Sequence, residues 1–274
     1  METSRRLFID SAADIEYAVR ALTDGAVVAT AFGNFYVIVT NPSPTTVRGV
    51  NLAKGRPVDQ VGSITTAAPR IPGMFDWERL SGRLVETRMR ALMDALYARG
   101  PFGFRGPAAE QLPDHLTQVD QGVRTTQVIA PGAACPSNLF FDRVARRLGG
   151  LPLYITSANR SRHLTGAVEE PAHWRADGII ADFAHVPNLV VIEHRDEAAA
   201  RATYPGYVPT SVTLLSFHAP RITPDGRPVL TVDRHGSLSI EDVRRVAEPL
   251  GFAVTLGATA RRRLAVRAYE EALV

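Results

Sequence analysis

The chain has 274 residues, of which 45% are hydrophobic and 22% are charged, and these proportions exclude a disordered or fibrous protein. Its net charge of +3 is too small to indicate nucleic-acid binding by itself. One cysteine, Cys135, excludes an internal disulfide and any multi-cysteine zinc site.

The first third of the chain predicts alternating strands and helices. Ser11 lies three residues before Asp14, a pattern typical of a helix N-cap, and Gly25 marks the end of that helix. In order we expect a strand at 6–9, a helix up to Gly25, strands at 26–30 and 35–40 around Gly33-Asn34, and another strand at 46–52.

The rest of the chain continues the alternation. We expect Asp76 to cap a long helix that runs through Ala98, and residues 99–124, rich in glycine, proline and charge, to form an exposed excursion. Further strands are expected at 126–130, 151–155, 178–181, 189–192, 210–216 and 229–233, and helices at 137–148, 239–247 and 259–272. The class is therefore α/β around a mixed twisted sheet, with a main domain at 1–248 and a small C-terminal extension at 249–274.

No apolar run approaches the roughly 20 residues that a membrane helix needs, and the N-terminus lacks the apolar stretch of a secretory signal. We therefore expect a cytoplasmic protein without membrane contact. The triplet 261–263, three arginines, is the one feature that points toward RNA, but no aromatic residue interleaves it, so a solvated helix face is the better interpretation.

Lys54 is the only lysine, against 30 arginines. Such a bias suggests that this position requires a compact ammonium group rather than a planar guanidinium. Lys54 and Arg56 are two residues apart after a predicted strand, with Gly55 between them. In an extended segment their side chains point to the same side, which suits a polyphosphate.

Two more groups of polar residues lie at predicted strand ends. Ser157 and Asn159 follow the strand at 151–155, where ligands bind in open α/β sheets. Pro209-Thr210-Ser211-Val212 and Arg234-His235-Gly236 add hydroxyls and a cation at the ends of later strands.

Other chemistry is poorly supported. The chain has no P-loop, no G-x-S-x-G elbow and no H-E-x-x-H, and its seven histidines show no metal-ligand spacing. Asp59, Asp182 and Glu193 are acids near strand ends that suit a magnesium ion held through water, and the spacing selects none of them.

The sequence resembles the YrdC family, which includes threonylcarbamoyl-AMP synthases of tRNA modification. The resemblance rests on four motifs in this order: Lys54-x-Arg56, Ser157-x-Asn159 within LPLYITSANRS, residues 209–212 and residues 234–236. The resemblance covers residues 7 to 248. It implies a twisted mixed sheet around a deep, positively charged cavity, and use of ATP, bicarbonate and threonine with Mg²⁺ to form threonylcarbamoyl-adenylate and pyrophosphate.

The resemblance assigns roles to this chain's residues. Lys54, Arg56 and Arg234 neutralise the triphosphate, with Lys54 and Arg56 as catalytic candidates. Ser157 and Asn159 fix the nucleotide. The candidates for the acceptor side are Asn34, Tyr36, Thr65 and Ser211.

The acceptor side departs from the family pattern. Residues 31–38 replace the family's P-T-D-T-x-Y-G-L, so both threonines are lost, and the family's histidine and a downstream arginine fall near Thr65 and Ile129. Residues 32–36 look somewhat like the G-G-F-H stretch of carbamoyltransferase domains, which form carbamoyl-adenylate from carbamoyl phosphate. We therefore expect threonine to be a poor substrate unless Arg70, Arg105 or Arg124 holds its carboxylate. The alternatives are another amine, carbamoyl phosphate, or a non-catalytic relative that binds nucleotide or RNA.

Overall fold

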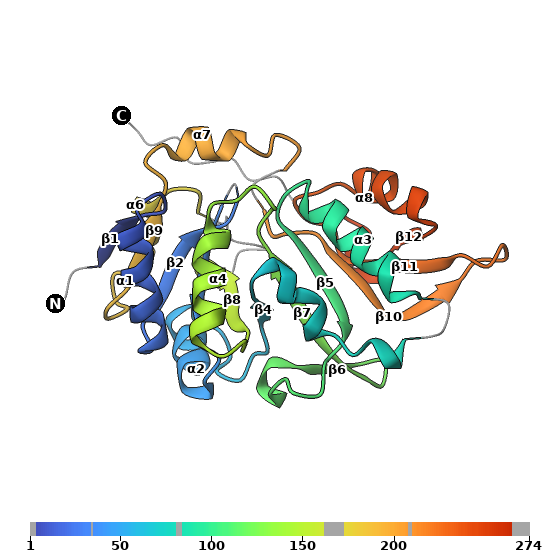
Figure 1. Ribbon diagram of the computed structural model, residues 1–274, viewed down its shortest axis with the longest axis horizontal. Coiled ribbons are helices and arrows are strands. Elements are labelled where there is room, and N and C mark those ends of the chain that lie inside the picture. The colour runs from blue at the N-terminus through green and yellow to red at the C-terminus, as the bar shows by residue number, and fades with distance from the viewer. Residues whose placement is uncertain (1–3, 34, 81–83, 162–172, 208–209, 265–274) are drawn as a thin grey trace.

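The computed structural model describes residues 4–33, 35–80, 84–161, 173–207 and 210–264. Their strands form one mixed sheet (Figure 1). Its order is β1 (Arg5–Phe8), β9 (Val190–Glu193), β2 (Val28–Ala31), β3 (Tyr36–Thr40), β8 (Leu153–Ser157), β4 (Ser63–Thr65), β7 (Val123–Ala130), β5 (Phe102–Pro107), β10 (Leu214–Ile222), β11 (Pro228–Arg234) and β12 (Ala253–Leu256), with β6 (Gln118–Asp120) paired to β7.

Parallel and antiparallel neighbours are mixed along the sheet, as the sequence predicts. Strands β2, β3, β8 and β4 run antiparallel in succession, whereas β4 pairs with β7 in parallel. Strand β5 lies antiparallel to β7 and parallel to β10. The α/β class with a mixed twisted sheet is confirmed.

Helices cover the sheet in two groups. Helices α1 (Ala12–Thr23) and α4 (Ser137–Arg147) lie side by side over one half, and α3 (Glu86–Tyr97) and α8 (Ile240–Ala247) lie together over the other (Figure 1). The remaining described helices are α2 (Pro44–Ala53), α6 (Ala176–Asp182) and α7 (Glu197–Ala202), and short 3₁₀ turns occur at 68–74, 77–79, 114–116, 248–250 and 258–260.

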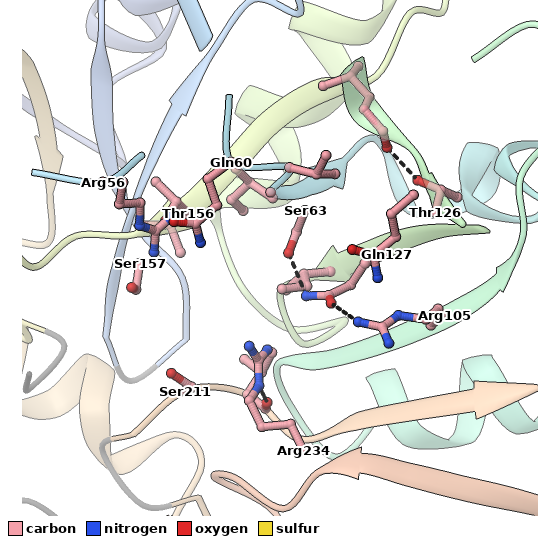
Figure 2. A pocket seen from close by; sticks show the side chains of 18 of the residues that line it. Arg56, Gln60, Ser63, Arg105, Thr126, Gln127, Thr156, Ser157, Ser211 and Arg234 are labelled. Carbon is pink, nitrogen blue, oxygen red and sulfur yellow. Dashed lines mark hydrogen bonds between the residues drawn. The ribbon is translucent and has the colours of Figure 1, made fainter. Parts of the chain in front are cut away.

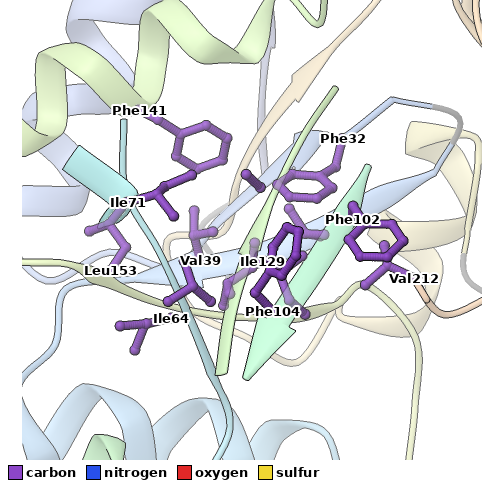
Figure 3. Packing of buried hydrophobic residues seen from close by; sticks show 14 of the residues in the cluster. Phe32, Val39, Ile64, Ile71, Phe102, Phe104, Ile129, Phe141, Leu153 and Val212 are labelled. Carbon is purple, nitrogen blue, oxygen red and sulfur yellow. The ribbon is translucent and has the colours of Figure 1, made fainter. Parts of the chain in front are cut away.

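Aromatic residues fill the core between the sheet and its helices. The ring centroids of Phe102 and Phe104 on β5 lie 5.1 Å apart, and Phe32 lies 6.0 Å from Phe141 on α4 (Figure 3). Each of these four residues is fully buried. Burying a side chain of this size contributes roughly 1.5–3 kcal/mol, so these residues fix the strands that line the site.

Local capping decides the early elements. Ser11 accepts from the Asp14 amide at 3.3 Å and begins α1, as predicted. The strand expected at 46–52 is wrong, since this segment is helix α2. Ser43 accepts from the Thr46 amide at 3.3 Å, Pro44 takes the first helical position, and Val47 and Val50 form the buried face.

The expectation of an exposed excursion at 99–124 is also wrong, because β5 and β6 lie there and β7 begins at Val123. The glycines of this segment suggested a loop, but they are needed where β5 packs against side chains of β10. A Cβ on Gly106 would lie 2.2 Å from the Phe217 ring, and one on Gly103 would lie 3.0 Å from Leu214. The glycines therefore let β10 side chains pack against β5.

Further element predictions need correction. The strand expected at 178–181 is helix α6, whose first amide, Ala176 N, donates to Glu197 Oε1 at 2.8 Å, a partner distant in sequence. Asp76 caps only a 3₁₀ turn at 77–79, and α3 begins at Glu86, with residues 81–83 outside the described chain. The strand expected at 210–216 begins at Leu214 and continues to Ile222.

In the predicted C-terminal extension at 249–274, β12 pairs in parallel with β11, so this part joins the same sheet. Of the helix expected at 259–272, residues 265–272 lie outside the described chain, and the described part contains only the 3₁₀ turn at 258–260. Arg263 donates to the carbonyls of Gly236 and Ser237 at 3.0 and 2.7 Å, so one arginine of the triplet is engaged within the fold. The domain boundary at 248 stays a prediction.

Candidate functional site

A cavity of about 240 Å³ opens on one face of the sheet where β8, β4, β7, β5 and β11 come together. Arginines approach it from three elements, and the described lining residues include no acid. Figure 2 shows Arg56 with Ser157 on one side, Arg105 on the other, and Arg234 with Ser211 below. The lining residues are Phe35, Val37, Arg56, Gln60, Val61, Gly62, Ser63, Arg105, Leu116, Gln118, Thr125, Thr126, Gln127, Ile129, Ile155, Thr156, Ser157, Ser211, Val212 and Arg234.

Arg56 reaches the cavity because the chain reverses directly after α2. Lys54 is the C-cap of that helix, and Gly55 follows with φ of +69°, a conformation that favours glycine. The Arg56 amide then donates to the Asn51 carbonyl at 2.9 Å. The predicted extended segment is therefore wrong, and Lys54 and Arg56 do not share one side of a strand.

Lys54 lies behind the cavity wall. Its side chain is fully buried, and Nζ donates to the carbonyl oxygens of Ser157 and Asn159. The Lys54 carbonyl accepts from the Ser161 amide at 2.9 Å. Burial, and then the charge of Arg56, lower the pKa of Lys54 well below its ordinary value. The expected contact of Lys54 with phosphate stays a prediction, and it requires the ammonium to leave these two carbonyls.

Ser211 and Arg234 meet at the cavity although they are distant in sequence. Arg234 Nε donates to the Val212 carbonyl at 2.8 Å, and the Ser237 amide donates to the Ser211 carbonyl at 2.9 Å. A Cβ on Gly236 would lie 1.9 Å from that same Ser211 oxygen. The two motifs that the sequence predicts at strand ends therefore form one loop pair, with Pro209 outside the described residues.

Arg105 forms the opposite wall. Its Nη1 lies 3.0 Å from Asp233 Oδ2 and 3.4 Å from Asp120 Oδ2, and its Nη2 donates to Gln127 Oε1 at 3.2 Å. Gln127 Nε2 in turn donates to Ser63 Oγ at 2.6 Å (Figure 2). Burial raises the pKa of Asp233, and the nearby Arg105 opposes that rise.

From the sequence, Arg105 was named only as one of three arginines that could hold the threonine carboxylate, and Ser63 and Gln127 were missed. A partial signal was present in β7, since residues 125, 127 and 129 share one face of the strand and line the cavity, although Thr126 lines it as well. In the sheet register Gln127 lies directly opposite Arg105.

Three other predicted site residues, Asn159, Tyr36 and Thr65, do not line the cavity. Asn159 Nδ2 donates to the Arg160 carbonyl at 2.8 Å, and the buried Tyr36 hydroxyl donates to Glu197 Oε1 at 2.5 Å. Burial raises the pKa of Tyr36 above its ordinary value. Thr65 is fully buried in β4. Asn34 lies outside the described residues.

The candidate magnesium acids are already engaged by other side chains. Asp59 pairs with Arg48 at 3.0 Å, Glu193 with Arg6 at 2.6 Å, and Asp182 lies 2.7 Å from His173 Nε2. The described part of the chain contains no cluster of three or more His, Cys, Asp or Glu side chains arranged to hold a metal. Nor does any helix in that part have the length and apolar character needed to span a membrane.

The fold is similar to solved structures of Sua5 and related proteins. Sua5 of P. abyssi complexed with L-threonine gives a TM-score of 0.60 at 18% identity, covering 97% of this chain and 67% of that one. A hypothetical protein of Streptococcus mutans UA159 gives 0.63 at 15% identity, covering 94% of this chain and 100% of that one. These structures confirm the fold that the YrdC resemblance implies.

HypF in its phosphate- and nucleotide-bound form gives a TM-score of 0.51 at 18% identity, covering 81% of this chain and 28% of that one. This chain spans about two thirds of the length of the Sua5 structures that it matches. No known family profile matches the sequence. No curated protein matches it either.

Proposed function

We propose that this chain binds ATP in the Arg56–Arg234 cavity and forms a carbamoyl-type adenylate with release of pyrophosphate. The observation that carries the proposal is the convergence of Arg56 and Arg234 with Ser157 and Ser211 on one cavity whose described lining contains no acid. Guanidinium groups are suited to bind phosphate oxygens in pairs, and the hydroxyls supply further donors.

The reaction depends on position and charge more than on a side-chain nucleophile. Arg56 and Arg234 stabilise the negative charge that develops on the departing pyrophosphate. Ser157 holds the nucleotide so that its α-phosphorus faces the carbamate, which bicarbonate and the amine form with loss of water, and Ser211 contacts the acceptor. The described lining offers no carboxylate to Mg²⁺, so the ion would have to enter with the phosphates of ATP, where it would supply further positive charge.

The structural similarity to Sua5 and HypF suggests two candidate sources of the carbamoyl group: bicarbonate with an amine, and carbamoyl phosphate. The Sua5 structure was complexed with L-threonine, which favours bicarbonate and an amine as the source. The HypF structure binds phosphate and nucleotide, which favours carbamoyl phosphate as the second candidate. We place bicarbonate with an amine first, in a pathway of tRNA modification or a diverged relative of it.

The experiment is an assay of pyrophosphate release from ATP and Mg²⁺. One arm contains bicarbonate with a panel of amines, L-threonine included, and another contains carbamoyl phosphate. Release in the amine arm or in the carbamoyl phosphate arm, lost in Arg56→Ala and kept in Arg48→Ala, supports the proposal. If the chain binds ATP but releases pyrophosphate in neither arm, the proposal is contradicted and the chain is a nucleotide-binding relative. Binding of tRNA without ATP binding identifies an RNA-binding one.

A further inference from the structure

The two ends of the cavity differ in charge. At one end Arg56 has no acid as an ion-pair partner among the described residues. At the other end Arg105 pairs with Asp233 at 3.0 Å and with Asp120 at 3.4 Å, and neither acid lines the cavity. The two carboxylates therefore compensate the positive charge of Arg105 from outside the cavity lining. Its Nη2 contacts Gln127, which lines the cavity.

His218 adds no positive charge to this group. Its Nδ1 lies 2.7 Å from Ser216 Oγ and its Nε2 lies 3.3 Å from Asp120 Oδ2. Burial lowers the pKa of His218, so the imidazole is neutral near pH 7. One guanidinium thus faces two carboxylates, so the positive charge of Arg105 is already compensated.

At the Arg105 end of the cavity, hydrogen bonds between the side chains hold a set of donors in place. Arg105 Nη2 donates to Gln127 Oε1 at 3.2 Å, and Gln127 Nε2 donates to Ser63 Oγ at 2.6 Å. These bonds fix the orientation of the Gln127 amide. After they form, Nη2 and Nε2 each keep one hydrogen and the Ser63 hydroxyl keeps its own. The array therefore suits an oxygen that accepts hydrogen bonds.

We propose that this end of the cavity is an acceptor subsite that selects an uncharged oxygen-bearing group, such as a carboxamide or hydroxyl, over a free carboxylate. The inference rests on the proposed function, because it assigns the acceptor side of the same cavity. A neutral carbonyl or hydroxyl oxygen satisfies the donors of Ser63, Gln127 and Arg105. A carboxylate would be the third anion beside Arg105, and like-charge juxtaposition is how a site rejects a competing ligand.

The test is calorimetric titration of the full chain with L-threonine, L-threoninamide and L-threoninol, which differ only at the carboxyl carbon. We expect the amide and the alcohol to bind the wild type at least about tenfold more tightly than the acid. Asp233→Asn removes one compensating charge, so the preference should fall by about tenfold, with L-threonine gaining affinity relative to the amide. Asp225→Asn is the matched control, because Asp225 pairs with Arg227 in the exposed β10–β11 turn.

Asp120→Asn, on the edge strand β6, is the second variant, and circular dichroism checks the folding of each. Wild-type affinity for L-threonine equal to or above that for the amide overturns the proposal, and so does failure to bind all three ligands. An unchanged preference in the folded variants overturns it as well. These titrations contain no ATP, so an amide preference without pyrophosphate release contradicts only the proposed function.

Discussion

The Lys54 ammonium donates to the carbonyl oxygen of Ser157, so a helix C-cap is joined to the end of β8 at the cavity wall. It also donates to the Asn159 carbonyl, and the Ser161 amide returns a bond to the Lys54 carbonyl at 2.9 Å. The only lysine of the chain therefore holds the turn that presents Ser157 to the cavity. Its compact ammonium lies in a fully buried position.

The first prediction follows from this arrangement. Lys54→Met keeps the volume but leaves the partly buried carbonyls of Ser157 and Asn159 without this donor, which costs about 2 kcal/mol of unfolding free energy. Lys54→Arg should also lose stability and most activity, because a planar guanidinium does not fit where an ammonium is enclosed. Urea denaturation and ATP calorimetry of both variants provide the measurements. Wild-type stability in Lys54→Met would contradict the role assigned here, and unchanged ATP affinity in that variant would exclude a direct phosphate contact.

The second prediction separates binding from folding. Arg56→Ala should weaken ATP binding by about tenfold to a hundredfold, the equivalent of roughly 1.5–3 kcal/mol for a hydrogen bond to a charged group. Its unfolding free energy should change little, because Arg56 is partly exposed and lines the cavity. Arg48→Ala is the control, since Arg48 lies on α2 in an exposed ion pair with Asp59. Equal ATP affinity in the Arg56 and Arg48 variants would remove Arg56 from the site.

Elements defined by interactions between residues close in sequence were predicted correctly, whereas elements that depend on residues distant in sequence were not. Local signals such as the Ser11 cap and the run of β-branched and aromatic residues in β3 were sufficient for the elements they define. Strand β5 was missed because its glycines are required by side chains of β10, more than 100 residues away in the sequence. Helix α6 was mistaken for a strand because no local N-cap marks its start, and its first amide is satisfied instead by Glu197, outside the helix.

The same distinction applies to the site. The motifs led to Arg56, Ser157, Ser211 and Arg234, and all four line the cavity. The motifs did not show that Lys54 turns away from the cavity, because that depends on the chain reversal at Gly55. Arg105 was not singled out, because it lies opposite Gln127 only once β5 and β7 pair in the sheet.

The third prediction concerns pH. His235 Nε2 accepts from the amide of Ile240, the first residue of α8, at 3.0 Å, so the folded chain requires that nitrogen to be unprotonated. Burial, and then Arg263, lower the pKa of His235 in the folded chain from its ordinary value of 6.5. On acidification the unfolded chain binds the proton first, so stability is retained above pH 6.5 and falls as the pH drops toward the folded pKa.

Urea denaturation between pH 7.5 and pH 5, about the range in which histidine changes charge, measures this effect. His235→Gln keeps an acceptor without titrating in this range, so its stability should fall less on acidification than that of the wild type. His185→Gln, at an exposed histidine, should follow the wild type. Identical pH dependence in the His235 variant and the wild type would contradict the assignment.

The last prediction is that L-threonine is a poor substrate, or none, although ATP binds. Ile129 lines the cavity at the position where the family resemblance places an arginine. Of the three arginines considered as substitutes, Arg124 donates to the Ala109 carbonyl at 3.1 Å and pairs with Asp114 at 3.2 Å, and Arg70 does not line the cavity.

Of these three arginines only Arg105 lines the cavity, and Asp233 and Asp120 already compensate its charge. An unpaired carboxylate costs several kcal/mol, and about 1.4 kcal/mol is tenfold in affinity, so we expect threonine use at least about a hundredfold weaker than in an ordinary synthase. Threonine-dependent pyrophosphate release measured beside such a synthase, at saturating ATP, decides the matter. A threonine KM within about 1 μM to 1 mM at normal turnover would show that another cation holds the carboxylate.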